Sequence, residues 1–207
     1  ETIDAFAKRA PAKLVGHGHG LGLGLVAPDA ALATAADAFA LDVAAYDQRG
    51  CLSPHAIYVL GDTSRADELS RRLATALDAV ALRLPRGPLD ASALAAQSVA
   101  RALAAMEGDV FEGASATVVH TRVFRGSPLN RFVRVIGVPD TAAFVDATRD
   151  VARYVTCIGV AGDLGSAPAL SRAAIVPAGT MQLPALAADA DGRPCFEGFV
   201  HDEEPIR

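Results

Sequence analysis

The stretch YDQRGCLSPH, residues 46–55, is the part of the sequence whose residue types best suit covalent chemistry. Helical spacing ends at Gly50, and Ser53-Pro54 turns the chain again, so Cys51 is predicted to lie in a turn. The thiolate is the reactive form of cysteine, and positive charge or helix-end amides lower a free thiol pKa of about 8.5. With Arg49 two residues before it, Cys51 is the candidate nucleophile. A half-buried structural cysteine is the alternative.

Histidines are the other titratable candidates near this thiol. His17 and His19 would share one face of a strand, and His55 lies four residues beyond Cys51. Each could polarise a reacting group or carry a proton, or could have a solvated or hydrogen-bonded structural role. His201 receives no mechanistic role. A metal site on His17 and His19 would need a third ligand that the sequence does not place, so no metal is expected.

A glycine-rich segment precedes the cysteine turn. In VGHGHGLGLGLV, residues 15–26, glycine occupies every second position from 16 to 24, and in a strand these positions share one face. Because that face is bare backbone, a neighbouring layer can pack tightly on it, or a ligand can approach it closely. The pattern GxGxxG fails in every register and no GKS or GKT follows, so we predict no phosphate-binding loop here.

The rest of the chain alternates predicted strands and helices. Helices are predicted over 29–46, from a cap at Asp62 or Ser64 to Pro85, over 90–106 and over 141–153, and strands over 56–60, 117–124, 131–138 and 156–162. Residues 132–161 have the pattern of one βαβ unit. The tail from Ala178 is predicted to wrap the surface. This alternation predicts an α/β fold, a three-layer arrangement around an open, mainly parallel sheet.

Composition excludes several classes of protein. The 207 residues are 51% hydrophobic and 21% charged, which suits one large globular domain or two small ones. The net charge is -5 with scattered cations, so no nucleic-acid partner is expected. No apolar run approaches the roughly 20 residues of a membrane span, and no secretory leader is expected at Glu1. Cys51, Cys157 and Cys195 form no CxxC pair, which favours a reducing cytoplasm.

The stretch YDQRGCLSPHAIYV resembles the catalytic segment of the acyl-CoA reductase family that includes the fatty acid reductase of bacterial luminescence, a branch of the aldehyde dehydrogenase superfamily. Residues 15–26, 29–46, 47–51 and 56–60 resemble, in order, the superfamily's glycine-rich strand, helix, cysteine turn and strand. Residues 130–162 resemble a later stretch of the same domain. The resemblance implies that residues 1–207 form an aldehyde dehydrogenase-like catalytic domain, the C-terminal half of a protein whose nicotinamide-binding half precedes residue 1.

Two positions depart from the superfamily pattern. A rough alignment puts His17 where ordinary aldehyde dehydrogenases have the glutamate that activates water against the thioester. Loss of that carboxylate suits acyl transfer and reduction, because hydrolysis would waste the acyl-enzyme. Ser127 and Leu129 fall where the superfamily has a Glu-x-Phe cofactor contact, so no residue of this chain is assigned to the cofactor.

The resemblance implies NADPH-dependent reduction of an acyl-CoA, or another acyl thioester, to an aldehyde. Cys51 would form the acyl-enzyme with its own N–H as an oxyanion donor, and NADPH would be held mainly by the preceding half. The expected partner is an acyl-CoA or acyl-carrier substrate, and relatives tend to form homo-oligomers. A thiol acyltransferase and a non-catalytic scaffold that keeps the fold are the alternatives.

Overall fold

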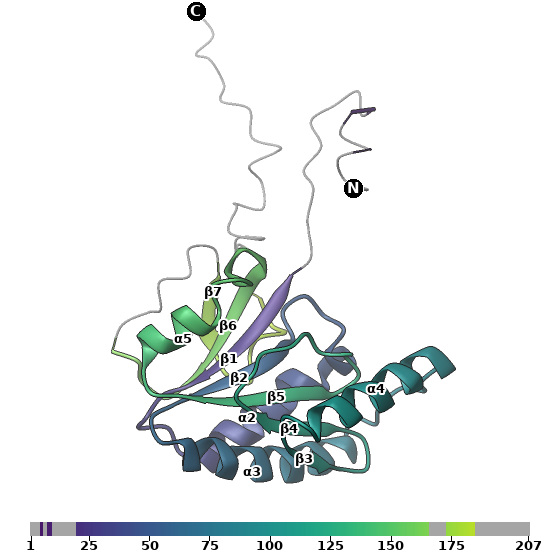
Figure 1. Cartoon of the computed structure of the whole chain (residues 1–207), viewed down its shortest axis with the longest axis horizontal. Coiled ribbons are helices and arrows are strands. Elements are labelled where there is room, and N and C mark those ends of the chain that lie inside the picture. The colour runs from purple at the N-terminus through teal and green to yellow at the C-terminus, as the bar shows by residue number, and fades with distance from the viewer. Residues whose placement is uncertain (1–4, 6–7, 10–19, 166–172, 185–207) are drawn as a thin grey trace, which may run out of the picture.

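The computed structural model describes residues 5, 8–9, 20–165 and 173–184, and its described strands form one sheet in the order β3-β4-β5-β2-β1-β6-β7 (Figure 1). Their bounds are β1 Leu21–Val26, β2 Pro54–Leu60, β3 Gly108–Glu112, β4 Thr117–Thr121, β5 Phe132–Val138, β6 Val155–Ala161 and β7 Ala174–Pro177. Every neighbouring pair is parallel except β3 and β4. The predicted mainly parallel sheet is confirmed.

Helices cover both faces of this sheet. They are α2 Leu32–Ala44, α3 Thr63–Ala81, α4 Ala91–Ala104 and α5 Thr141–Ala147, with the 3-10 helices η1 Ala45–Gln48 and η2 Ala152–Tyr154. One core cluster joins α2 and α3 to one face, and a second joins α5 to the opposite face (Figure 1). α4 packs through Ala104 against Val119 and Phe132, beyond the edge of that second cluster. The predicted three-layer α/β arrangement is confirmed. None of the described helices combines the length and apolarity needed to cross a bilayer.

The alternating sequence of β1 divides its two faces between different neighbours. Leu21, Leu23 and Leu25 enter the core under α5. On the other face, a Cβ added to Gly24 would lie 2.7 Å from Cε1 of Phe39 in α2. The helix therefore packs directly on glycine backbone, which agrees with the interpretation that a neighbouring layer packs tightly on this face.

Several element boundaries differ from the predicted ones. α2 begins at Leu32 rather than at Asp29, because the Asp29 carboxylate accepts from the Asp163 backbone N–H at 3.0 Å instead of capping a helix. Asp62 is the cap of α3 and accepts from the Ser64 N–H at 3.0 Å. α5 ends at Ala147, where Thr148 donates its hydroxyl back to Phe144 O at 2.8 Å and leaves helical geometry.

The predicted connections need two corrections. β5, α5 and β6 follow one another as predicted, but β2 and β1 lie between β5 and β6 in the sheet, so they are not a neighbouring βαβ pair. Residues 178–184 do not simply wrap the surface, because Met181 is 1% exposed and packs against Gly159 on the α2 face. The rest of that tail lies outside the described residues.

Candidate active site

Cys51 lies exposed at the amino ends of three parallel strands. β2 begins three residues after it, and Gly20, directly before β1, lies against its side chain. Thr156, near the start of β6, donates its hydroxyl to Cys51 O at 3.0 Å. Open parallel sheets usually bind ligands at the carboxyl ends of their strands, so the fold alone would have pointed to the opposite edge.

The cysteine turn lies on the glycine face of β1. A Cβ at Gly20 would lie 2.7 Å from Cys51 Cβ, and one at Gly22 would lie 2.5 Å from Ser53 O. Neither position has room for a side chain while the turn keeps its place. The alternating glycines therefore have two roles. Gly20 and Gly22 form a flat surface, the glycine floor, on which the cysteine turn packs, and Gly24 makes room for the ring of Phe39.

Two left-handed backbone segments support this turn. Tyr46, Asp47 and Gln48 have φ of 53°, 51° and 63°, and Leu129, Asn130 and Arg131 have φ of 65°, 57° and 66°. Left-handed geometry costs a residue other than glycine roughly 1–2 kcal/mol, so it persists only where surrounding contacts impose it. The two segments meet directly, because Asn130 N–H donates to Asp47 O at 3.0 Å.

The Gln48 side chain acts as a clamp between the turn and the sheet. It is fully buried, and its amide donates to Pro54 O at 2.8 Å and Phe132 O at 2.9 Å. Its carbonyl oxygen accepts from Phe132 N–H at 2.9 Å. One side chain therefore fixes the first residues of β2 and β5 to the segment that leads into Cys51.

A buried ion pair extends the same support. Arg131 is 1% exposed, and its Nε donates to Asp47 Oδ1 at 2.8 Å while its Nη2 donates to Leu84 O at 2.8 Å. The second Asp47 oxygen accepts from Gly87 N–H at 2.9 Å. Arg131 is the buried partner of this ion pair, so removing Asp47 would leave its charge uncompensated, which is costly.

Arg49, the cation predicted to act on the thiol, is engaged elsewhere. Its Nε and Nη2 donate to Asn130 Oδ1 at 3.0 and 2.8 Å. In this arrangement Arg49 joins the two left-handed segments, which makes it part of the support of the turn.

The segment after β7 reaches the turn from the other side. Gln182 donates to Ser53 Oγ at 3.0 Å. Asp42 of α2, 2% exposed, holds this segment by accepting from the backbone N–H groups of Gly179 at 2.6 Å and Met181 at 3.0 Å. Burial outweighs these two hydrogen bonds and raises the pKa of Asp42 to about 6. No sequence pattern pointed to Gln182, which lies in a region without periodicity.

The other sequence candidates differ from Cys51 in environment. Cys157 is buried, and burial, with smaller effects of Asp42 and Cys51, raises the pKa of its thiol to about 12. His55 in β2 is half-buried, and burial lowers its pKa and favours the neutral imidazole. His17, His19, His201 and Cys195 lie outside the described residues.

One cluster of possible metal ligands was not predicted. Ligand atoms of Asp67, Asp109 and His120 lie within 4.8 Å of one another on α3, β3 and β4. Asp67 is already paired with Arg71, whose Nη2 lies 3.1 Å from its carboxylate. We assign no metal to this group.

Solved structures of oxidoreductases, aldehyde dehydrogenases among them, share this fold. An oxidoreductase from Marinobacter aquaeolei matches with a TM-score of 0.63 and 19% identity, over 82% of this chain and 40% of that chain. An NAD-dependent benzaldehyde dehydrogenase from Corynebacterium glutamicum matches with a TM-score of 0.59 and 20% identity, over 77% of this chain and 38% of that chain. The chain therefore has an aldehyde dehydrogenase-type fold and spans 40% or less of the length of these neighbours.

The family follows from the sequence itself. The model of the family described as acyl-CoA reductase (LuxC) matches residues 1–201. The chain belongs to this family, as the resemblance of the cysteine segment predicted. No curated protein matches it.

Proposed function

We propose that this chain is the thiol-bearing part of an acyl-CoA reductase, in which Cys51 takes the acyl group from a thioester before its reduction to an aldehyde. Family membership supports the reaction class. The observation that carries the proposal is an exposed cysteine on a glycine floor, held by the Gln48 clamp and by two strained backbone segments. Strain of this kind gathers at functional sites.

The acyl transfer needs a nucleophile and a place for the oxyanion. The Cys51 thiolate attacks the thioester carbonyl, the carbon–sulfur bond to coenzyme A breaks, and the released coenzyme A thiolate takes a proton from water. One thioester replaces another, so the step is nearly isoergic. The Cys51 N–H donates to no other group in the described residues and is available to the oxyanion. Such a donor contributes roughly 3 kcal/mol to the barrier reduction.

The groups that contact the turn suit a persistent acyl-enzyme. Among the described residues, Gly20, Thr156 and Gln182 contact residues 51–53, and none of these three carries a carboxylate. A carboxylate base at this place would direct water onto the thioester. Its absence from these contacts favours acyl transfer over aldehyde oxidation.

The hydride would come from a nicotinamide cofactor, NADPH by the family resemblance. Ser127, at the position of the superfamily's cofactor contact, does not fit that role here. Its Oγ lies 2.6 Å from Phe132 O and accepts from Leu129 N–H at 2.8 Å, so its hydrogen bonds serve the turn. We therefore propose that residues 1–207 form one catalytic domain and that the cofactor is bound mainly by a separate half of the protein.

Intact mass after incubation with a long-chain acyl-CoA tests this function. The parent chain should gain one acyl group, Cys51→Ala should gain none, and the matched control Cys157→Ala should behave as the parent. Absence of the adduct with every chain length would favour a non-catalytic scaffold. Transfer of the acyl group to added thiols, without aldehyde when NADPH and the cofactor-binding half are supplied, would favour an acyltransferase.

A further inference from the structure

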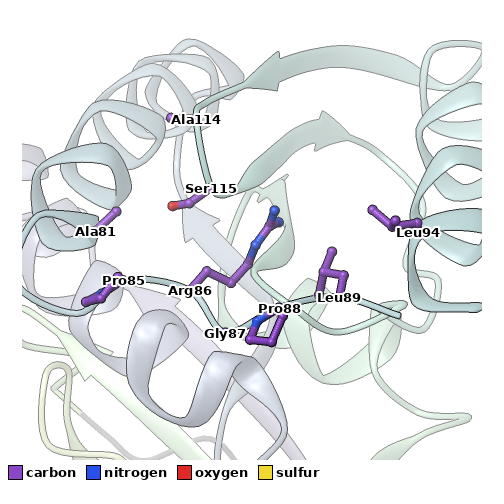
Figure 2. A pocket seen from close by; sticks show the side chains of 9 residues that line it. All are labelled: Ala81, Pro85, Arg86, Gly87, Pro88, Leu89, Leu94, Ala114 and Ser115. Carbon is purple, nitrogen blue, oxygen red and sulfur yellow. The ribbon is translucent and has the colours of Figure 1, made fainter. Parts of the chain in front are cut away.

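An open pocket of about 350 Å3 lies beside Asp47, whose carboxylate accepts from the N–H of the lining residue Gly87. Figure 2 shows its lining side chains. It is lined by Ala81, Pro85, Arg86, Gly87, Pro88, Leu89, Leu94, Ala114 and Ser115. Arg86 is the charged member of this lining and Ser115 supplies its hydroxyl. In Figure 2, Arg86 extends from the 85–89 segment into the space between Ser115 and Leu89. The pocket therefore combines one cation and one hydroxyl with apolar walls.

Neither polar side chain of this pocket has a partner in the part of the chain that the structure describes. Ser115 Oγ is buried without a hydrogen bond, and the half-buried Arg86 has no hydrogen-bond or ion-pair partner among the described residues. The carboxylates next to the pocket are engaged elsewhere. Asp47 pairs with Arg131, and Asp78 accepts from Ala114 N–H at 2.9 Å. Partly buried polar groups without partners carry a desolvation cost that an anionic oxygen ligand would offset.

We propose that Arg86 and Ser115 bind the phosphate at the end of the pantetheine arm of the thioester substrate. This inference rests on the proposed function and assigns the part of the donor that the protein recognises. Guanidinium groups bind phosphate through paired, charge-assisted hydrogen bonds. The apolar wall of Leu89, Leu94 and Pro85 suits the dimethyl carbon next to that phosphate in pantetheine.

The pocket lies at the same edge of the sheet as Cys51. Ser115 shortly precedes β4, and Gly20 under Cys51 directly precedes β1, so both sites are at the amino ends of parallel strands. β4 and β1 are separated by β5 and β2, which is three strand spacings, or about 14 Å. The arm between the phosphate and the sulfur has about twelve bonds, like four extended residues, and also reaches about 14 Å. A phosphate at Arg86 would therefore let the thioester reach Cys51.

The spacing between the two sites is fixed by the buried ion pair. Asp47, four residues before Cys51, accepts from Gly87 N–H, and its partner Arg131 donates to Leu84 O. The segment that carries Arg86 is thus attached to the same network that holds the cysteine turn.

Three acyl donors of increasing size test the assignment. Acyl-pantetheine lacks the phosphate, acyl-4′-phosphopantetheine has it, and acyl-CoA adds the nucleotide. Arg86→Gln should lower the second-order rate of Cys51 acylation roughly tenfold with the two phosphorylated donors and leave acyl-pantetheine unchanged. Arg83→Gln removes an equal charge from an exposed position outside the pocket and should leave all three rates unchanged.

Several results would overturn the assignment. Equal losses with all three donors would mean that Arg86 supports the fold, and equal losses in both variants would mean only long-range attraction. A loss confined to acyl-CoA would assign the pocket to the nucleotide. If no donor acylates Cys51, the proposed function fails, and calorimetric titration decides the pocket separately. Phosphopantetheine should then bind more tightly than pantetheine or inorganic phosphate, and Arg86→Gln should abolish the difference; any other ranking rejects the site.

Discussion

Cys51 and Cys157 lie one strand apart and have opposite environments. Cys51 is exposed over the start of β1, whereas Cys157 of β6 pairs with Gly22 of β1 and is 1% exposed. Burial raises the pKa of the Cys157 thiol to about 12, so near neutral pH it is both inaccessible and protonated. In a Cys195→Ala background, iodoacetamide should label Cys51 in the folded chain and Cys157 only after unfolding. Peptide mass mapping measures both, and comparable labelling rates in the folded chain would reject Cys51 as the selected nucleophile.

Asp42 should make the stability of the chain depend on pH. Its pKa is about 6 in the folded chain against an ordinary value of 3.8, so between these values the folded chain holds a proton that the unfolded chain releases. The contribution of Asp42 is therefore full below this window and is lost as pH rises through it. Relative to Asp42→Asn, the free energy of unfolding should fall by about 2 kcal/mol between pH 4 and pH 7.

Urea unfolding of both proteins at several pH values measures this dependence. Asp42→Asn has one carbonyl oxygen for the two N–H groups of Gly179 and Met181, which adds a loss that does not vary with pH. The slope of the difference, rather than its size, is therefore the informative quantity. Parallel curves would show that the pKa of Asp42 is the same in the folded and unfolded chain.

The sequence singled out Cys51 as the candidate nucleophile but did not reveal the side chains that support its turn. The residue types around Cys51 were sufficient to single it out. The partners of Gln48 and Arg49 were not foreseeable, because Phe132 and Asn130 lie more than 80 residues away and side-chain hydrogen bonds over that separation leave no periodic pattern. Arg49 shows this limit of sequence reasoning. It is close to Cys51 in sequence, but its hydrogen-bond partner in the structure is Asn130.

Among the elements, β1 and the cysteine turn depend on each other most closely. A methyl group at Gly22 would meet the backbone oxygens of Leu52 and Ser53, the latter at 2.5 Å. Backbone cannot rotate away as a side chain can, so Gly22→Ala should lift the turn. We expect a loss of about 1–3 kcal/mol in stability. Acylation should be almost abolished even where the variant remains folded.

Gly126→Ala is the matched control, because a Cβ there would meet nothing within 4 Å. Its stability and its acylation rate should equal those of the parent. Urea unfolding and intact mass are measured on the same samples. Parental acylation by Gly22→Ala would show that the turn does not need the glycine floor.

The elements that the sequence failed to predict share a physical feature. β3 is mostly exposed and β7 has four residues, so neither has the run of buried branched residues by which β2 and β5 were recognised. Both are also outermost strands of the sheet, where one side lacks a partner strand in the described residues. Strand order was likewise not predictable, because β1 pairs on one side with β2, the next strand along the chain, but on the other side with the distant β6.

The chain holds the proposed acyl site but spans 40% or less of the length of its structural neighbours. With acyl-CoA and NADPH, we expect the chain alone to release one equivalent of coenzyme A and to remain acylated. The Ser127 hydroxyl is engaged with Phe132 and Leu129, and in the part of the chain that the structure describes no carboxylate contacts residues 51–53, so we expect neither a cofactor contact nor a water-activating base there. Thiol release and NADPH absorbance, followed together, measure the two steps. Cys51→Ala should release no coenzyme A, and sustained NADPH consumption by the chain alone would contradict the proposed division, because the cofactor site would then lie within these 207 residues.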